Sequence, residues 1–258
     1  MTMTKQRGPL AWLKGLYEYL AYYLGLSSFA LMCLFWSIAA WPLLLLPKRL
    51  GVKLGRRIIM RGFAVYLWLL ELSGIFKFDL QALDVLRHDR SLIIAPNHPS
   101  LIDVVMIVSR LPNVVCIIKA ALSEMLIYGG SARLAGYIRG VSQTGLITDA
   151  VQEIQSGSQL LVFPEGTRTQ GEILHPFKGG FALIAKKSNA PVQTVFIDIN
   201  HPFLCKERPL WVKPEFPLHF SIRLGRRFMP DGEIKYCVAE MEDYCRSQVE
   251  NGKPEEAR

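Results

Sequence analysis

A histidine and an aspartate stand five positions apart in the segment Asn97-His98-Pro99-Ser100-Leu101-Ile102-Asp103. Neutral imidazole accepts a proton near neutral pH, and a neighbouring carboxylate fixes its tautomer and stabilises the imidazolium. The pair therefore predicts a general base that deprotonates a hydroxyl group. A purely structural alternative is that Ser100-x-x-Asp103 forms a helix capping box and that His98 is an ordinary loop histidine.

The attacking hydroxyl is expected to belong to a substrate. The chain has no Gly-x-Ser-x-Gly elbow, and none of its five cysteines lies in a recognisable nucleophile setting. We predict no metal and no cofactor, because the spacing of the remaining histidines is not typical of metal ligands. These histidines are His88, His175, His201 and His219.

A second motif, Phe163-Pro164-Glu165-Gly166-Thr167-Arg168, ends an apolar run. Gly166 permits a tight turn, and Arg168 offers a planar fork of donors for phosphate or carboxylate. Lys178 follows at the start of a predicted helix, where exposed backbone amides suit an anion. By itself each piece would be an ordinary turn or a solvated basic helix. Their order after the His-x4-Asp segment favours a substrate site.

These motifs resemble those of the glycerolipid acyltransferases of the lysophosphatidic acid acyltransferase type. Residues 97–103 are similar to the first motif (HX4D), 163–168 to the third and 190–195 to the fourth, and the resemblance covers Leu92 to Ile199. It implies that His98 is the base and Asp103 its partner. By the same resemblance, the acceptor's phosphate or other polar head is bound by Glu165, Gly166, Thr167 and Arg168, with weaker support from Lys178 and Arg139.

Two departures from the family pattern concern the acceptor. The segment Gly136-Tyr137-Ile138-Arg139 fits the second motif only loosely, and Thr194 stands where the fourth motif usually has a proline. We expect both to affect substrate shape more than acyl-transfer chemistry. Lys119 also follows a strand, but we expect it to be a surface lysine.

The elements that position these residues alternate between short apolar strands and helices from residue 74 to 258. Both main motifs follow strands, and ligands of open α/β sheets bind beyond the carboxyl ends of the strands. We therefore predict an α/β domain with a largely parallel central sheet flanked by helices, as the resemblance also implies. The predicted strands are Ile75–Phe78, Leu92–Ala95, Val114–Ile118, Leu160–Phe163 and Val192–Ile199, with a β-rich edge at Leu210–Leu224, and the predicted helices are Leu101–Ser109 with Ser100 as N-cap, Thr148–Ser156, Lys178–Lys187 and Ile234–Val249.

Residues 1–73 predict an N-terminal membrane anchor. The stretch 19–47 contains no charged residue and exceeds the roughly 20 residues needed to cross a hydrocarbon core. A basic interfacial helix is expected at about 50–72, and its positive charge favours the cytoplasmic side and anionic headgroups. A spanning helix and a half-embedded one both fit this pattern. The odd number of cysteines, without Cys-x-x-Cys, indicates a reducing compartment.

The net charge of +8 and the pI near 9.3 fit an acidic partner. Because half of the chain is hydrophobic and the basic run follows the apolar segment, membrane lipids are expected rather than nucleic acid. The sequence thus predicts an O-acyltransferase at the cytoplasmic face of a membrane, the inner membrane if the protein is bacterial. The acyl donor would be a thioester of acyl-carrier protein or coenzyme A, and the acceptor a lysophospholipid, foremost 1-acyl-glycerol-3-phosphate.

Two alternatives remain open at this stage. The first keeps the chemistry but changes the acceptor to a non-phosphate lipid, such as a lyso-aminolipid or a specialised polyene or glycolipid precursor. The second is a non-catalytic lipid-binding scaffold.

Overall fold

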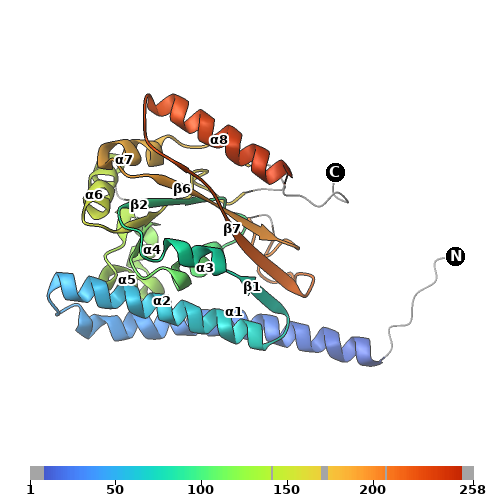
Figure 1. Ribbon diagram of the computed structural model, residues 1–258. Coiled ribbons are helices and arrows are strands. Elements are labelled where there is room, and N and C mark those ends of the chain that lie inside the picture. Colours follow the sequence, from blue (N-terminus) through green and yellow to red (C-terminus); the bar gives the residue numbers. More distant parts are fainter. Residues whose placement is uncertain (1–8, 141, 170–173, 207, 252–258) are drawn as a thin grey trace.

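A twisted β-sheet lies between layers of helices in the computed structural model, which describes residues 9–140, 142–169, 174–206 and 208–251 (Figure 1). The sheet contains seven strands in the order β1-β7-β6-β2-β5-β3-β4 within these residues. All neighbouring strands are parallel except β6 and β7, which are antiparallel. The strands are β1 (Phe76–Asp79), β2 (Leu92–Pro96), β3 (Val114–Lys119), β4 (Ile138–Gly140), β5 (Gln159–Leu161), β6 (Val192–Ile199) and β7 (Leu218–Phe228).

The centre of the sheet is formed by β2, whose five residues are all buried. It pairs in parallel with β5 on one side and β6 on the other, so Ile93 lies between Leu160 and Val192. A strand that is covered on both faces needs continuous rather than alternating hydrophobicity, which explains its apolar run. The turns after β2 and β5 therefore lie next to each other, and the predicted fold class is confirmed.

Helices cover both faces of the sheet. On one face Met106 of α3 packs into a core that Ile94 shares, and on the other Ile154 of α6 packs into a core that Ile93 shares. The helices that follow β1 are α3 (Asp103–Arg110), α4 (Ala120–Glu124), α5 (Leu126–Leu134), α6 (Gln143–Gln155), α7 (Gly180–Ser188) and α8 (Ile234–Asn251), with a short 3-10 helix η1 at Gln81–Leu86.

Several predicted boundaries differ from the structure. Helix α3 begins at Asp103 rather than Leu101, and Ser100 is not its N-cap. Helix α6 begins five residues before the predicted start, because the Ser142 hydroxyl accepts a hydrogen bond from the amide of Gly145 and caps it. The predicted β-rich edge is the single strand β7, which begins at Leu218.

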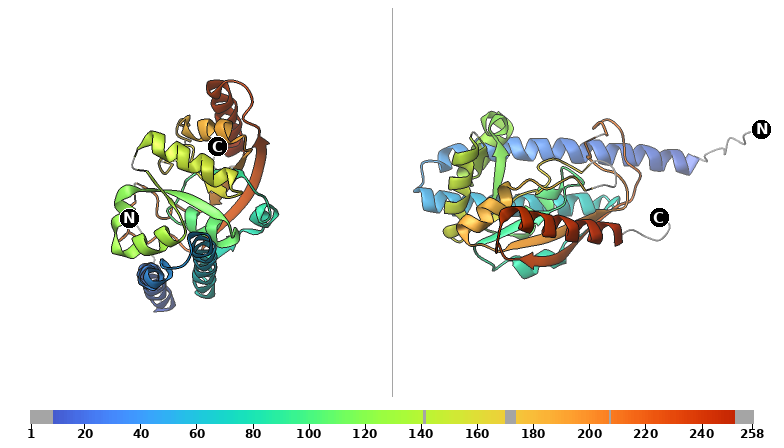
Figure 2. Two further views of the ribbon diagram at one scale, coloured as in Figure 1. Left: turned by 90° about the vertical axis from the view of Figure 1, so that its left-hand side faces the viewer. Right: turned by 90° about the horizontal axis from the view of Figure 1, so that it is seen from above.

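Two long N-terminal helices, α1 (Pro9–Leu43) and α2 (Lys48–Leu72), lie side by side along one side of the molecule (Figures 1 and 2). By length and composition alone, α1 could cross a membrane. However, one stripe of α1 packs against α5 so closely that a Cβ atom at Gly130 would overlap the carbonyl oxygen of Ser37. We call α1 and α2 together the hairpin, and its residues Tyr22 and Leu67 belong to the hydrophobic core on one face of the sheet. The division of the chain into residues 1–73 and 74–258 stays a prediction.

A buried arginine ties α2 to the catalytic domain. The Arg56 side chain is 4% exposed and donates hydrogen bonds to the carbonyl oxygen of Ala135, to Asn113, to Ser158 and to the carboxylate of Glu153, all between 2.8 and 3.0 Å. These acceptors come from four separate parts of the catalytic domain. A buried charge that is fully paired in this way fixes the docking of the helix that carries it.

Candidate active site

The histidine and aspartate of the first motif meet in the structure. His98 lies in the turn after β2, Asp103 begins α3, and the His98 Nδ1 atom is 2.9 Å from Asp103 Oδ2. The same Asp103 oxygen accepts the amide hydrogen of Ser100 at 2.8 Å. The carboxylate therefore satisfies the backbone of the turn and also holds the imidazole, and the catalytic role of the pair stays a prediction. A hydrogen bond from Nδ1–H to the carboxylate leaves Nε2 as the basic nitrogen.

The imidazole ring of His98 is held in place by stacking. Its centroid is 3.7 Å from that of Phe163, and the ring planes are inclined by only 19°. Phe163 is the first residue of the third motif, so each motif contributes one of the two stacked rings. With Asp103 on Nδ1 and Phe163 on its face, the ring of His98 has a fixed orientation, as a general base needs.

Complete burial raises the pKa of Asp103 to about 6, although the hydrogen bonds from His98 and Ser100 act in the opposite direction. The carboxylate is fully inaccessible to solvent, and its Oδ1 has no hydrogen-bond partner among the residues that the structure describes. At neutral pH the group is nevertheless ionised. The site thus contains a carboxylate that is poorly solvated and strongly directed at one partner, His98.

Glu165 of the third motif joins the two turns. Its side chain is 1% exposed, and its carboxylate accepts hydrogen bonds from the amide of His98 at 3.2 Å, the hydroxyl of Thr169 at 2.8 Å and the amide of His175 at 3.0 Å. The carbonyl oxygen of His98 in turn accepts the amide hydrogen of Thr169 at 2.8 Å. Glu165 therefore connects the turn that carries His98 to the turn of the third motif, and its expected contact with the acceptor stays a prediction.

Lys178 reaches the turn of the third motif. Gly166 has a φ of +66°, and a Cβ atom there would lie 2.7 Å from the Lys178 Nζ atom, so the lysine side chain crosses the glycine. The amide of Lys178 also donates to the carbonyl oxygen of Pro164 at 2.9 Å. The structure thus brings Lys178 beside Gly166 and the half-buried Thr167. A glycine is needed at this position both for the positive φ and for the close approach of Lys178.

The guanidinium group of Arg168 is partly engaged within the protein. Its Nη1 atom donates a 2.8 Å hydrogen bond to the carbonyl oxygen of Leu204, in the segment between β6 and β7. This contact fixes the direction of the Arg168 side chain, which is half-buried.

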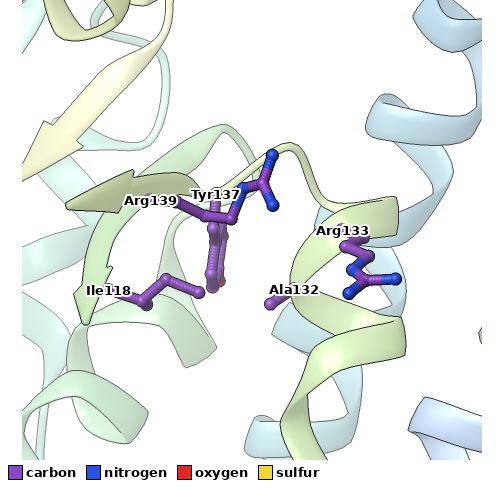
Figure 3. Close-up of a pocket in the computed structure, with 5 residues that line it drawn as sticks. All are labelled: Ile118, Ala132, Arg133, Tyr137 and Arg139. Carbon is purple, nitrogen blue, oxygen red and sulfur yellow. The ribbon is translucent and has the colours of Figure 1, made fainter. Parts of the chain in front are cut away.

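Arg139 is the middle residue of β4, and two strands, β5 and β3, lie between β4 and the strand that precedes His98. It lines a cavity of about 500 Å³ together with Arg133 (Figure 3). Figure 3 shows the two guanidinium groups arising from different elements, β4 and α5. The structure therefore places Arg139 in a pocket whose lining includes neither His98 nor Asp103. The remaining lining residues are Ile118, Ala132 and Tyr137.

Two residues have roles that the sequence did not reveal. The Asn97 side chain donates to the carbonyl oxygen of Ile197 at 3.0 Å and accepts its amide hydrogen at 2.7 Å, which extends the pairing of β2 with β6 to the start of the catalytic turn. The signal in the sequence that could have predicted this role is an amide side chain directly before the histidine. Thr194 is buried and donates to the carbonyl oxygen of Arg226, so it supports the pairing of β6 with β7, and its expected effect on the acceptor stays a prediction.

Comparison with known proteins agrees with this geometry. The profile of the acyltransferase family matches residues 77–198, which include β2, both turns and all of β6 except Ile199. The chain is thus similar to the acyltransferase family over just under half of its length. Among the described residues, no group of three or more His, Cys, Asp or Glu side chains is arranged to hold a metal ion, and the absence of a cofactor stays a prediction.

The curated relatives that the chain resembles are named for more than one acceptor. The 1-acyl-sn-glycerol-3-phosphate acyltransferase of Helicobacter pylori is 31% identical over 127 residues, which are 46% of this chain and 52% of the relative. The lyso-ornithine lipid O-acyltransferase of Pseudomonas aeruginosa is 31% identical over 134 residues, 50% of this chain and 51% of the relative. The chain thus spans about half the length of the curated relatives it matches.

A solved structure shares the fold over nearly the whole chain. The crystal structure of the 1-acyl-sn-glycerophosphate acyltransferase from Thermotoga maritima superposes with a TM-score of 0.63 at 19% identity, covering 94% of this chain and 99% of that one. Coverage this complete includes most of the N-terminal helices. At this identity the likeness establishes the fold.

Proposed function

We propose that this acyltransferase moves a fatty acyl group from a thioester to the free hydroxyl of a lysophospholipid at a membrane surface. The observation that carries the proposal is the 2.9 Å contact between His98 Nδ1 and the buried Asp103 carboxylate, which leaves Nε2 as a base. The turn of the third motif, with Lys178 across Gly166, adds a positive charge beside this base.

The proposed reaction is a single displacement without an acyl-enzyme. His98 Nε2 removes the proton of the acceptor hydroxyl while Asp103 stabilises the imidazolium, a contribution of about 10² to 10⁴ in rate. The acceptor oxygen attacks the thioester carbonyl, the carbon–sulfur bond breaks, and the departing thiolate takes the proton from His98. The carrier of the donor is either coenzyme A or acyl-carrier protein.

The leading acceptor is 1-acyl-glycerol-3-phosphate, because most of the curated relatives are named for it. In this proposal Arg168 and Lys178 bind its phosphate, and Glu165 and Gly166 shape the turn that presents them. A second candidate is a lyso-aminolipid. It is favoured by the relative named for lyso-ornithine lipid, which is as similar to this chain as the first phosphate-type relative.

We further propose that α1 lies half-embedded in the membrane rather than crossing it. Its stripe from Glu18 through Tyr22 and Ser37 to Ala40 is buried against the protein, whereas the rest of its surface exposes leucine and aromatic side chains. Because α5 packs against α1 at Ser37, a crossing helix would draw α5 into the hydrocarbon. The exposed basic residues of α2 support our proposal that residues 74–258 lie at the cytoplasmic face, because positive charge favours that side and attracts anionic headgroups.

The decisive experiment measures acyl transfer by the purified protein with both donor carriers and both acceptors. We expect His98→Ala to lower kcat by at least about 10²-fold. His219→Ala is the matched control, since His219 is an exposed histidine outside the site, and it should retain activity. Near-normal transfer by His98→Ala would refute the mechanism. Lipid binding without turnover by the wild type would instead support the scaffold.

A further inference from the structure

A long segment between β6 and β7 connects both catalytic turns to the N-terminal hairpin. We call residues 200–206 and 208–217 the strap. The carbonyl oxygen of Leu204 accepts hydrogen bonds from the amide of Leu101 at 3.3 Å and from Arg168 Nη1 at 2.8 Å. Leu101 belongs to the catalytic turn and Arg168 to the third motif. One carbonyl group of the strap therefore contacts both halves of the site.

The outer part of the strap is fastened to α1. The Tyr22 hydroxyl donates to the carbonyl oxygen of Leu210 at 2.7 Å, and the Tyr23 hydroxyl donates to that of Trp211 at 3.0 Å. The ammonium group of Lys213 forms an ion pair with Glu18 at 2.5 Å, in which both side chains are less than one-fifth exposed. The right-hand view of Figure 2 shows this segment passing beside α1. Backbone and charge contacts thus hold the strap and α1 together.

The tip of the strap exposes apolar side chains without a protein partner to cover them. Trp211 is 74% exposed and Leu210 is 52% exposed. They adjoin the tyrosine face of α1, where Tyr19 and Tyr23 are also exposed. This continuous surface combines tryptophan, tyrosine and leucine, the composition of side chains that lie at a membrane–water boundary. A run of α1 without any charged residue adjoins it, which favours lipid over a protein as the occupant.

We propose that the strap is a second membrane contact whose tip, Leu210 to Val212, enters the interface of an anionic bilayer. Its base, Leu204, then transmits that contact to Arg168 and to the turn that carries His98. Binding of the tip is independent of catalysis, whereas the coupling to Arg168 rests on the proposed function. In this arrangement Trp211 is a positioning residue for acceptors that are presented in a membrane.

The first test measures where Trp211 lies when the protein binds vesicles of phosphatidylethanolamine and phosphatidylglycerol that contain brominated lipids. The fluorescence of the Trp211→Phe variant is subtracted from that of the wild type, because other tryptophans lie on α1 and α2. We expect the Trp211 signal to be quenched most strongly by bromines near the interface. A Trp211 signal that is not quenched while the remaining tryptophans are quenched would overturn the proposal.

The second test separates surface binding from chemistry. With acceptor in vesicles, Trp211→Asp should raise KM about tenfold, equivalent to about 1.4 kcal/mol, and leave kcat nearly unchanged. With a short-chain acceptor that remains monomeric in solution, the variant and the wild type should be equal. Tyr236→Asp is the matched control, because Tyr236 is 71% exposed on α8, on the opposite side of the molecule from α1 (Figure 1).

Two outcomes would contradict this coupling. Equal KM values for Trp211→Asp and wild type on vesicles would show that the tip makes no useful membrane contact. An equal loss on vesicle and monomeric acceptors, together with a lower Tm, would assign Trp211 a structural role only. If the wild type transfers acyl groups to neither acceptor, the proposed function fails, and the quenching experiment still decides whether the tip binds the bilayer.

Discussion

At the scale of single residues, Asp103 lowers the stability of the folded protein at neutral pH, because its ionised carboxylate is fully buried. A carboxyl group in an unfolded chain has a pKa near 3.9, whereas burial raises that of Asp103 to about 6 in the folded protein. The folded state therefore binds this proton more tightly, so the resulting stabilisation is present at low pH and is lost as pH rises through about 6. At neutral pH the ionised carboxylate favours catalysis at the expense of stability.

Asp103→Asn tests this trade-off. We expect kcat/KM to fall by about 10² to 10⁴, because the amide no longer stabilises the imidazolium of His98. The Tm at pH 7.5 should equal or exceed that of the wild type, and the difference should narrow at pH 5, where Asp103 is protonated in the wild type. Thermal unfolding at both pH values measures this. A large loss of stability at pH 7.5 would contradict the argument.

The wild-type pH profile provides a second measurement on the same pair. We expect kcat/KM to rise with pH and to level off above about 6, where the Asp103 carboxylate is ionised. The apparent pKa belongs to the coupled His98–Asp103 pair rather than to either residue. An activity that rises toward low pH would be incompatible with a base at His98.

How far the sequence predicts the site depends on the range of each contact. His98 and Asp103 lie in one short segment, so their spacing and residue types already indicate their meeting. The role of Glu165 depends on amides and a hydroxyl from three separate positions, including His175 in another part of the loop. No local pattern shows that a carboxylate will have its oxygens occupied in this way.

At the scale of helices and strands, an element is hard to predict from sequence where glycines allow it to pack closely against another element. Helix α5 contains Gly129 and Gly130, and glycine in a helix is unfavourable by about 1 kcal/mol relative to alanine, so no helix was predicted there. The contact with Ser37 of α1 explains the glycine at 130. By contrast, the central strands were predictable to within about two residues, because their burial requires continuous apolar runs.

Gly130→Ala should destabilise the protein by about 1 to 3 kcal/mol, despite the higher helix propensity of alanine, because the new Cβ atom overlaps the backbone of α1. Gly15→Ala is the matched control, since a Cβ atom at that position of α1 meets nothing within 4 Å. That control should be neutral or slightly stabilising. Thermal unfolding in one detergent compares the two. Equal effects would show that α1 and α5 do not approach as closely as described.

At the scale of the whole molecule, neighbouring arginines of α2 have opposite environments. Arg56 is buried in its network of hydrogen bonds, whereas Arg57 is exposed beside Lys53 and Arg61. The sequence alone shows only a cluster of basic residues, because the partners of Arg56 lie far along the chain. The fold therefore divides one basic segment into a buried structural residue and an exposed basic surface.

Arg57→Gln and Arg56→Gln should consequently behave differently. We expect Arg57→Gln to weaken binding to anionic vesicles by about 1 kcal/mol and to leave the Tm unchanged, with a difference that shrinks as salt is added. Arg56→Gln should lower the Tm, because Glu153 loses its buried partner, and should leave the salt dependence of vesicle binding unchanged. Co-sedimentation and thermal unfolding measure the two effects. A similar response from both variants would refute this division.

The contact between Tyr22 and Leu210 joins positions 188 residues apart in the chain. During synthesis α1 and α2 leave the ribosome long before α5 and the strap exist, so their inward-facing stripe has no protein partner at that time. In the proposed attachment of α1 to lipid, the membrane is the surface that this stripe meets during that interval. The order of synthesis would then make the membrane the first surface on which α1 and α2 assemble, with α5 and the strap packing onto them afterwards.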